Sequence, residues 1–79
     1  MNVDVVLFAS LSEYQPDGLG GRQARTFELD EGTRIADVIT TLKLPDLPRV
    51  IFVDGRHAPE DHVLAEGERL AIFPPVAGG

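Results

Sequence analysis

The sequence predicts an α+β fold in which one helix lies across a mixed sheet of about four to five strands. Three observations lead to this prediction. The chain has 79 residues, which is enough for one small domain but not for two. Short β-type apolar runs lie toward both ends of the chain. Between them lies one segment whose apolar residues recur at the spacing of an amphipathic helix.

The first two predicted strands occupy residues 3–8 and 24–29. Residues 3–8 are mostly β-branched or aromatic and apolar on both faces, which is typical of a central strand. From Ser10 to Arg25 the chain is rich in glycine and turn formers, so we expect a long loop with a short helical turn at residues 11–14. Residues 24–29 then alternate, which places Phe27 and Leu29 on the core side of a strand paired with the first.

The predicted helix has about ten residues and follows Thr33, whose hydroxyl is suited to capping its first turn. Pro45 should end it at or before Leu44. Asp37 and Lys43 suit the positive and negative ends of the helix dipole. The apolar positions follow the i, i+3, i+4, i+7 pattern of a single buried face: Ile35, Val38, Ile39 and Leu42.

The last third of the chain predicts the rest of the sheet. Residues 50–53 form an apolar run that ends in a tight turn at Asp54-Gly55. A short edge segment is expected at residues 57–59, because Pro59 cannot donate a ladder hydrogen bond. Residues 69–73 form the final strand. The first and last strands are the most apolar and should lie side by side in the middle, which is the β-grasp arrangement.

A β-grasp domain at residues 1–73 should therefore be followed by an extended tail at residues 74–79. Pro74 and Pro75 lack backbone donors and stiffen its base. Fully extended, six residues reach about 20 Å. Gly78 and Gly79 have no Cβ, so they could enter a narrow enzyme channel with an unhindered terminal carboxylate. The alternative interpretation is a frayed end that happens to contain two glycines.

Residues 70–79, Leu-Ala-Ile-Phe-Pro-Pro-Val-Ala-Gly-Gly, resemble the C-terminus of the small subunit of molybdopterin synthase, within the MoaD/ThiS-like sulfur carriers. The layout of the whole chain is similar, including the opening Val-Leu-Phe-Ala and three shorter motifs. These motifs are Glu31-Gly32-Thr33, Val53-Asp54-Gly55-Arg56 and Glu66-Gly67-Glu68-Arg69. Two departures are visible. Leu11-Ser12-Glu13 stands where many relatives have Leu-Arg-Glu, and Asp54 stands where Asn is common.

The resemblance implies a ubiquitin-like fold and a carrier that is not itself an enzyme and binds no cofactor. An adenylating, E1-like enzyme would use ATP to activate Gly79, and a persulfide would convert its carboxylate to a thiocarboxylate. The large subunit of molybdopterin synthase would then accept the tail and pass the sulfur to a pterin precursor. Gly78 would give passage through the channel. The partner-binding residues would be those at the tail and its base: Phe8, Phe73, Pro74, Pro75, Val76 and Ala77.

Three alternatives stay open. Related carriers serve thiamin, cysteine or tungsten-cofactor synthesis. A ubiquitin-like protein modifier would use the same activation but join Gly79 to lysines of other proteins. A β-grasp interaction module would use no tail chemistry at all. We also expect an apolar patch beside the tail, formed by Phe8, Val53 and Phe73 on the sheet face opposite the helix.

Composition excludes several other functions. The chain has no cysteine, so it holds neither a disulfide nor a thiolate site, and it is expected in the cytoplasm. A net charge of −6 disfavours nucleic acid and suits either basic partners or solubility alone. No membrane span is expected. His57 and His62, in predicted loops with Glu60 and Asp61 between them, lack metal-site spacing, so no metal site is predicted.

Overall fold

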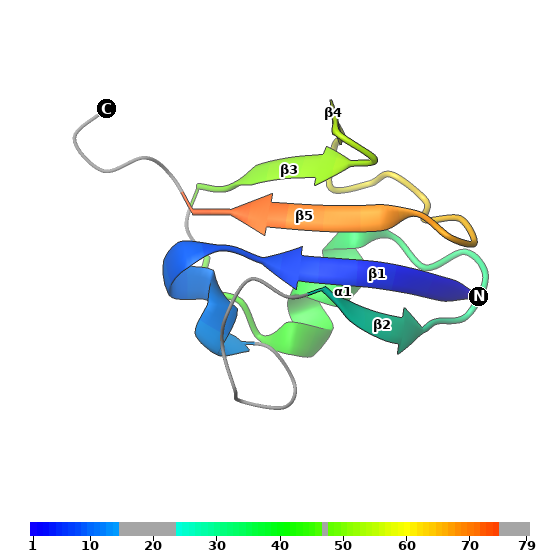
Figure 1. Cartoon of the computed structure of the whole chain (residues 1–79), viewed down its shortest axis with the longest axis horizontal. Coiled ribbons are helices and arrows are strands. Elements are labelled where there is room, and N and C mark those ends of the chain that lie inside the picture. Colours follow the sequence, from blue (N-terminus) through cyan, green and yellow to red (C-terminus); the bar gives the residue numbers. More distant parts are fainter. Residues whose placement is uncertain (15–23, 47, 75–79) are drawn as a thin grey trace.

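The structure is a computed structural model that describes residues 1–14, 24–46 and 48–74. Five strands form one mixed sheet, and the helix α1 (Ile35–Leu42) lies across one of its faces (Figure 1). The strands are β1 (Asn2–Leu7), β2 (Arg25–Glu28), β3 (Val50–Val53), β4 (Arg56–His57) and β5 (Arg69–Phe73). A six-residue 3₁₀ segment, η1 (Ala9–Tyr14), follows β1.

The strand order is β2-β1-β5-β3-β4, with β1 and β5 parallel and the other neighbouring pairs antiparallel. The first and last strands therefore lie side by side in the middle of the sheet, as predicted for a β-grasp fold. This confirms the α+β class, the mixed sheet and the single α-helix.

Alternation along the strands builds the core between the sheet and α1. Every second residue of the central strands is buried, and α1 adds the residues of its apolar face. Phe27 and Leu29 pack against this core as half-buried residues, as the sequence predicted. The buried core cluster comprises Val3, Val5, Leu7, Leu11, Ile35, Val38, Ile39, Ile51, Val53, Leu64, Leu70 and Ile72.

The start of α1 differs from the prediction. The N-cap is Arg34, not Thr33, and the Thr33 hydroxyl donates instead to the Asp30 carbonyl at 2.7 Å. Asp37 folds back to accept the Arg34 backbone N–H at 2.9 Å. The next two helix N–H groups, of Ile35 and Ala36, donate to the carbonyls of His62 and Glu60. The segment at residues 60–62 therefore supplies the partners that a capping side chain would otherwise provide.

The other end of α1 stops before Leu44, as predicted. Lys43 adopts a left-handed conformation with φ of 57°, and the Leu44 N–H donates to the Ile39 carbonyl at 3.2 Å. This closes the helix in the manner of a Schellman turn, with lysine where glycine is usual. The chain then turns at Pro45 toward β3.

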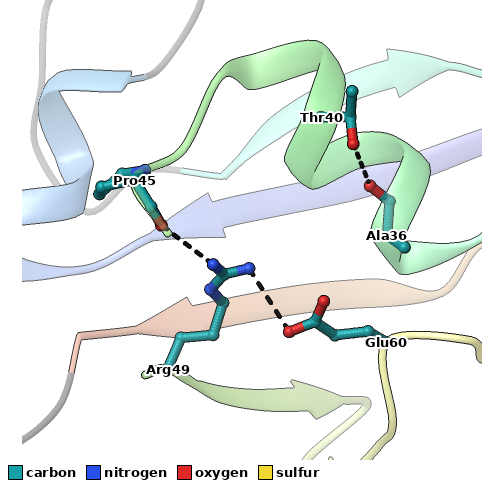
Figure 2. A network of polar contacts seen from close by, with 5 residues as sticks. All are labelled: Ala36, Thr40, Pro45, Arg49 and Glu60. Atoms are coloured by element: carbon teal, nitrogen blue, oxygen red, sulfur yellow. Dashed lines mark hydrogen bonds and ion pairs between the residues drawn. The ribbon is translucent and has the colours of Figure 1, made fainter. Parts of the chain in front are cut away.

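The return to β3 is held by Arg49, whose side chain is only 10% exposed. Its guanidinium donates to the Pro45 carbonyl at 2.9 Å and lies 3.4 Å from a carboxylate oxygen of Glu60 (Figure 2). The Glu60 carbonyl in turn accepts the Ala36 N–H of α1. Arg49 thus joins the end of the helical connection, the start of β3 and the segment that caps α1.

The turn from β3 to β4 follows the prediction for Asp54-Gly55. Both residues have positive φ, 50° and 81°, which gives the two-residue turn that matches strand twist. The Asp54 carboxylate also accepts the Arg69 N–H at the start of β5, at 3.0 Å. The edge strand, however, is Arg56–His57 and stops before Ala58 and Pro59, which the sequence placed in it.

Candidate functional site: the base of the tail

The candidate site lies where the chain leaves the middle of the sheet. β5 ends at Phe73, which pairs with Val50 of β3. On its other side, the Phe8 N–H donates to the Ile72 carbonyl at 3.1 Å. Pro74 follows as a half-buried residue. The chain therefore departs from between two strands that hold it on both sides (Figure 1).

Three phenylalanines surround this point, and we call them the aromatic cluster: Phe8, Phe52 and Phe73. The rings of Phe8 and Phe73 stack with centroids 4.2 Å apart and planes 6° from parallel. Phe52 meets Phe73 edge to face, at 5.7 Å. The imidazole of His57 lies over Phe52 at 4.4 Å. All three phenylalanines are half-buried, so part of each ring faces solvent.

Strand alternation explains why the cluster lies on the face away from α1. Leu7, Ile51 and Ile72 point toward the helix-side core, so their neighbours Phe8, Phe52 and Phe73 point the other way. Sheet register then brings the three rings together. Phe73 is two residues after Ala71, and Ala71 pairs with Phe52 on one side and Val6 on the other.

The prediction for this patch was right for Phe8 and Phe73 but wrong for Val53. Val53 is 7% exposed and belongs to the core, whereas the β3 residue that joins the other two rings is the half-buried Phe52. Four consecutive apolar residues in β3 hid the alternation from the sequence. No local signal separates Phe52 from Val53. The face of each is fixed by the pairing of β3 with β5, which sets Ile51 opposite the buried Ile72 and Phe52 opposite Ala71.

The outer face changes character along the strands. Near the end of β5 it carries the aromatic cluster, with Val6 fully buried behind it. Toward the opposite end it is polar: Asp4 pairs in register with Arg69 on β5 and accepts the Thr26 hydroxyl at 2.8 Å. The apolar half of the sheet face away from α1 therefore lies beside the end of β5, where a protein partner could bury it.

The predicted residues Pro75, Val76, Ala77, Gly78 and Gly79 lie outside the described residues, so their roles stay predictions. Phe8, Phe73 and Pro74 are brought together at the base of the tail. The structure thus shows where β5 ends, at Phe73, and the extended tail beyond it stays a prediction.

The histidines are engaged in other contacts. The His62 ring nitrogen Nε2 lies 3.2 Å from a Glu68 carboxylate oxygen, and the same oxygen accepts the Ala65 N–H at 2.7 Å. His57 contacts Phe52. Within residues 1–14, 24–46 and 48–74, no three histidine or acidic side chains are grouped so that they could hold a metal ion. In the same residues, no helix is long and apolar enough to cross a membrane.

Comparison with known proteins agrees with this arrangement. Similar structures include a Pyrococcus furiosus protein assigned as subunit 1 of molybdopterin converting factor, which is 26% identical with a TM-score of 0.74 over 96% of this chain and 99% of that one. SAMP1 from Haloferax volcanii is 24% identical with a TM-score of 0.73 over all of both chains.

A third similar structure comes from a complex of subunits 1 and 2 of molybdopterin-converting factor from Helicobacter pylori. It is 15% identical with a TM-score of 0.62 over all of both chains. Among curated proteins, none matches the chain significantly. The family model of the ThiS family, however, matches residues 5–79, nearly the whole sequence. The chain, a MoaD/ThiS-like β-grasp protein, therefore belongs to the ThiS family.

Proposed function

We propose that this protein is a sulfur carrier whose Gly79 carboxylate becomes a thiocarboxylate, for delivery to a pterin precursor in molybdopterin synthesis. The observation that carries the proposal is the place where the last strand ends. Residues 74–79 follow a central strand in the sequence, and that strand ends beside the aromatic cluster, on the sheet face away from α1. The match to the ThiS family extends through Gly79 and supports the same assignment.

The chemistry requires activation, because a carboxylate is a poor electrophile. An E1-like enzyme joins the Gly79 carboxylate to AMP from ATP and releases pyrophosphate. The terminal sulfur of a protein persulfide then attacks the acyl carbon, AMP leaves, and a thiol cleaves the resulting acyl disulfide to free the thiocarboxylate. The carrier binds no cofactor itself. We propose that it acts in the cytoplasm, where the enzyme's ATP is available.

The carrier's own contribution is to present the Gly79 carboxylate to the partner enzymes. Gly78 and Gly79 let the backbone pass close to channel walls, and Pro74 and Pro75 limit the conformations lost on insertion. The aromatic cluster, with Pro74, Pro75, Val76 and Ala77, provides the contact surface at the channel mouth. The large subunit of molybdopterin synthase is the proposed acceptor. The Helicobacter pylori complex of subunits 1 and 2 supports a partner of this kind.

The direct test is the intact mass of the untagged protein after co-expression with its host's adenylating enzyme and a sulfur source. We expect a gain equal to the difference between one sulfur and one oxygen atom, located at Gly79 by fragmentation. A matched control is the Gly79→Ala protein, whose bulkier terminus should reduce the modified fraction. The adenylating enzyme must also be shown to activate another carrier. If it does and the mass of this protein stays unmodified, the proposal is contradicted and an interaction module is favoured.

A second candidate is a protein modifier, favoured by the similarity to SAMP1, whose longer name is small archaeal modifier protein 1. The two functions share the activation of Gly79 and differ in the acceptor. Isopeptide-linked adducts between Gly79 and lysines of host proteins would support the modifier. Cofactor synthesis that fails when the gene is deleted, without such adducts, would support the carrier.

A further inference from the structure

Within the described residues, the strand β2 has one backbone edge that pairs with no other strand. It is the outermost strand beside β1, at the lower edge of the sheet in Figure 1. The opposite edge is less open to pairing, because β4 has two residues and Pro59 follows closely.

The pairing of β2 with β1 determines which backbone N–H and C=O groups of β2 point away from β1. Leu29 and Met1 exchange two backbone hydrogen bonds, each of 2.8 Å. Bonded and non-bonded pairs alternate in an antiparallel ladder, so Phe27 opposite Val3 forms the next bonded pair. The N–H and C=O groups of Thr26 and Glu28 therefore point away from β1. Two residues at this spacing are what an added strand needs to form a new ladder.

A depression of about 280 Å³ adjoins this edge, between β2 and α1. Its floor is apolar: Phe27 and Leu29 are half-buried, and Val38 is 2% exposed. A strand added to β2 would direct every second side chain toward this floor. The free backbone and the apolar depression therefore serve one and the same kind of ligand, an extended peptide segment.

The charged side chains that line the depression are all acidic. The residues lining it are Phe27, Glu28, Leu29, Asp30, Thr33, Asp37, Val38 and Thr41, which include three exposed carboxylates and no lysine or arginine. A basic segment would be attracted here. A second copy of this chain would bring the same carboxylates and no basic segment, and the register that sets the two Glu28 residues opposite one another would place like charges together.

We propose that the β2 edge and the adjoining depression dock an extended segment of a partner protein, one with alternating apolar side chains and flanking basic residues. The site lies away from the base of the tail and does not depend on chemistry at Gly79. It would let a partner hold the protein while residues 74–79 are engaged elsewhere.

The probe is a synthetic peptide of alternating valine and threonine with two arginines at one end, titrated into the full chain. NMR should show amide shifts confined to residues 25–30 and 37–41. Thr26→Pro removes an N–H that faces away from β1 and should weaken binding by about tenfold or more. Thr26→Val is the matched control: it loses the hydroxyl bonded to Asp4 but keeps the N–H, so binding should be unchanged.

Two further measurements separate backbone from charge. A peptide N-methylated at the positions facing β2 should not bind, and this result stands even if Thr26→Pro fails to fold. The triple variant Glu28→Gln, Asp30→Asn and Asp37→Asn should bind several-fold more weakly at low salt, with the difference lost at high salt.

Three outcomes would overturn the proposal. One is peptide binding that shifts the NMR amide signals of the aromatic cluster alone. Another is binding that Thr26→Pro and N-methylation both leave intact. The third is a concentration-dependent dimer that Thr26→Pro abolishes without any peptide binding, which would make a second copy the occupant. Conversion of Gly79 to a thiocarboxylate should be equal in wild type and Thr26→Pro, so failure here and failure of the sulfur-carrier proposal are distinguishable.

Discussion

Lys43 ends α1 in the left-handed region of backbone conformation, with φ of 57° and ψ of 40°. A side chain makes this conformation unfavourable by about 1–2 kcal/mol, whereas glycine adopts it freely. We expect Lys43→Gly to stabilise the protein by about 0.5–1 kcal/mol and raise its melting temperature by a few degrees. Thermal unfolding followed by circular dichroism would measure the change.

Lys43→Ala is the matched control for this prediction, because it removes the charge and the long side chain but keeps the Cβ. It should give no gain in stability. A loss of stability in Lys43→Gly would mean that the lysine side chain contributes more at the negative end of the helix dipole than the backbone conformation costs.

Residue-level prediction from the sequence was weakest where partners are distant in the chain. Thr33 has the right chemistry for an N-cap, but the carbonyls of Glu60 and His62 occupy the first helix donors instead. The pairing of His62 with Glu68 likewise depends on a turn whose geometry no local pattern specifies. Such contacts form only when the fold brings distant residues together, so no local sequence pattern predicts them.

The connection between α1 and β3 is an element-scale feature that depends on Arg49. Replacing it by methionine keeps the apolar stem but leaves the Pro45 carbonyl without its 2.9 Å partner. We expect Arg49→Met to lower the free energy of unfolding by about 1–2 kcal/mol. Chemical denaturation would measure this loss, with an unchanged slope if only the folded state is affected.

Glu60→Gln provides the comparison. The Glu60 side chain is 51% exposed and its contact with Arg49 is 3.4 Å long, so the ion pair should contribute less than about 0.5 kcal/mol. An equal loss in both variants would show that the ion pair, and not the bond to Pro45, holds the connection.

At the scale of elements, the order of strands and helix was predictable because each has a distinct periodicity. The amphipathic spacing from Ile35 to Leu42 coincides with α1, although the helix has eight residues and not the predicted ten or so. The alternation around Phe27 predicted both that β2 is a strand and which of its faces meets the core. In β3, by contrast, Val50 to Val53 are all apolar, so the buried face could be assigned only after pairing with β5 was known.

At the scale of the whole molecule, the fold and the proposed function should be separable. The buried core cluster ends at Ile72, so deletion of Gly78 and Gly79 should leave the melting temperature within about 1 °C of wild type. The same deletion should abolish thiocarboxylate formation and cofactor synthesis, because the new terminal carboxylate, on Ala77, lies two residues short and carries a Cβ. Complementation of a host strain lacking the gene measures the second effect; normal cofactor production from the shortened protein would contradict the sulfur-carrier proposal.

The position of β5 between β1 and β3 also has a mechanical consequence. A force applied to the chain beyond Phe73 runs along β5 and loads its hydrogen bonds to both neighbours in shear. Bonds loaded in shear share the force and must fail together, whereas an edge strand pulled sideways can unzip one bond at a time. Withdrawal of residues 74–79 from a partner's channel, in the function proposed above, would therefore load the sheet in its strongest direction and leave the folded domain intact.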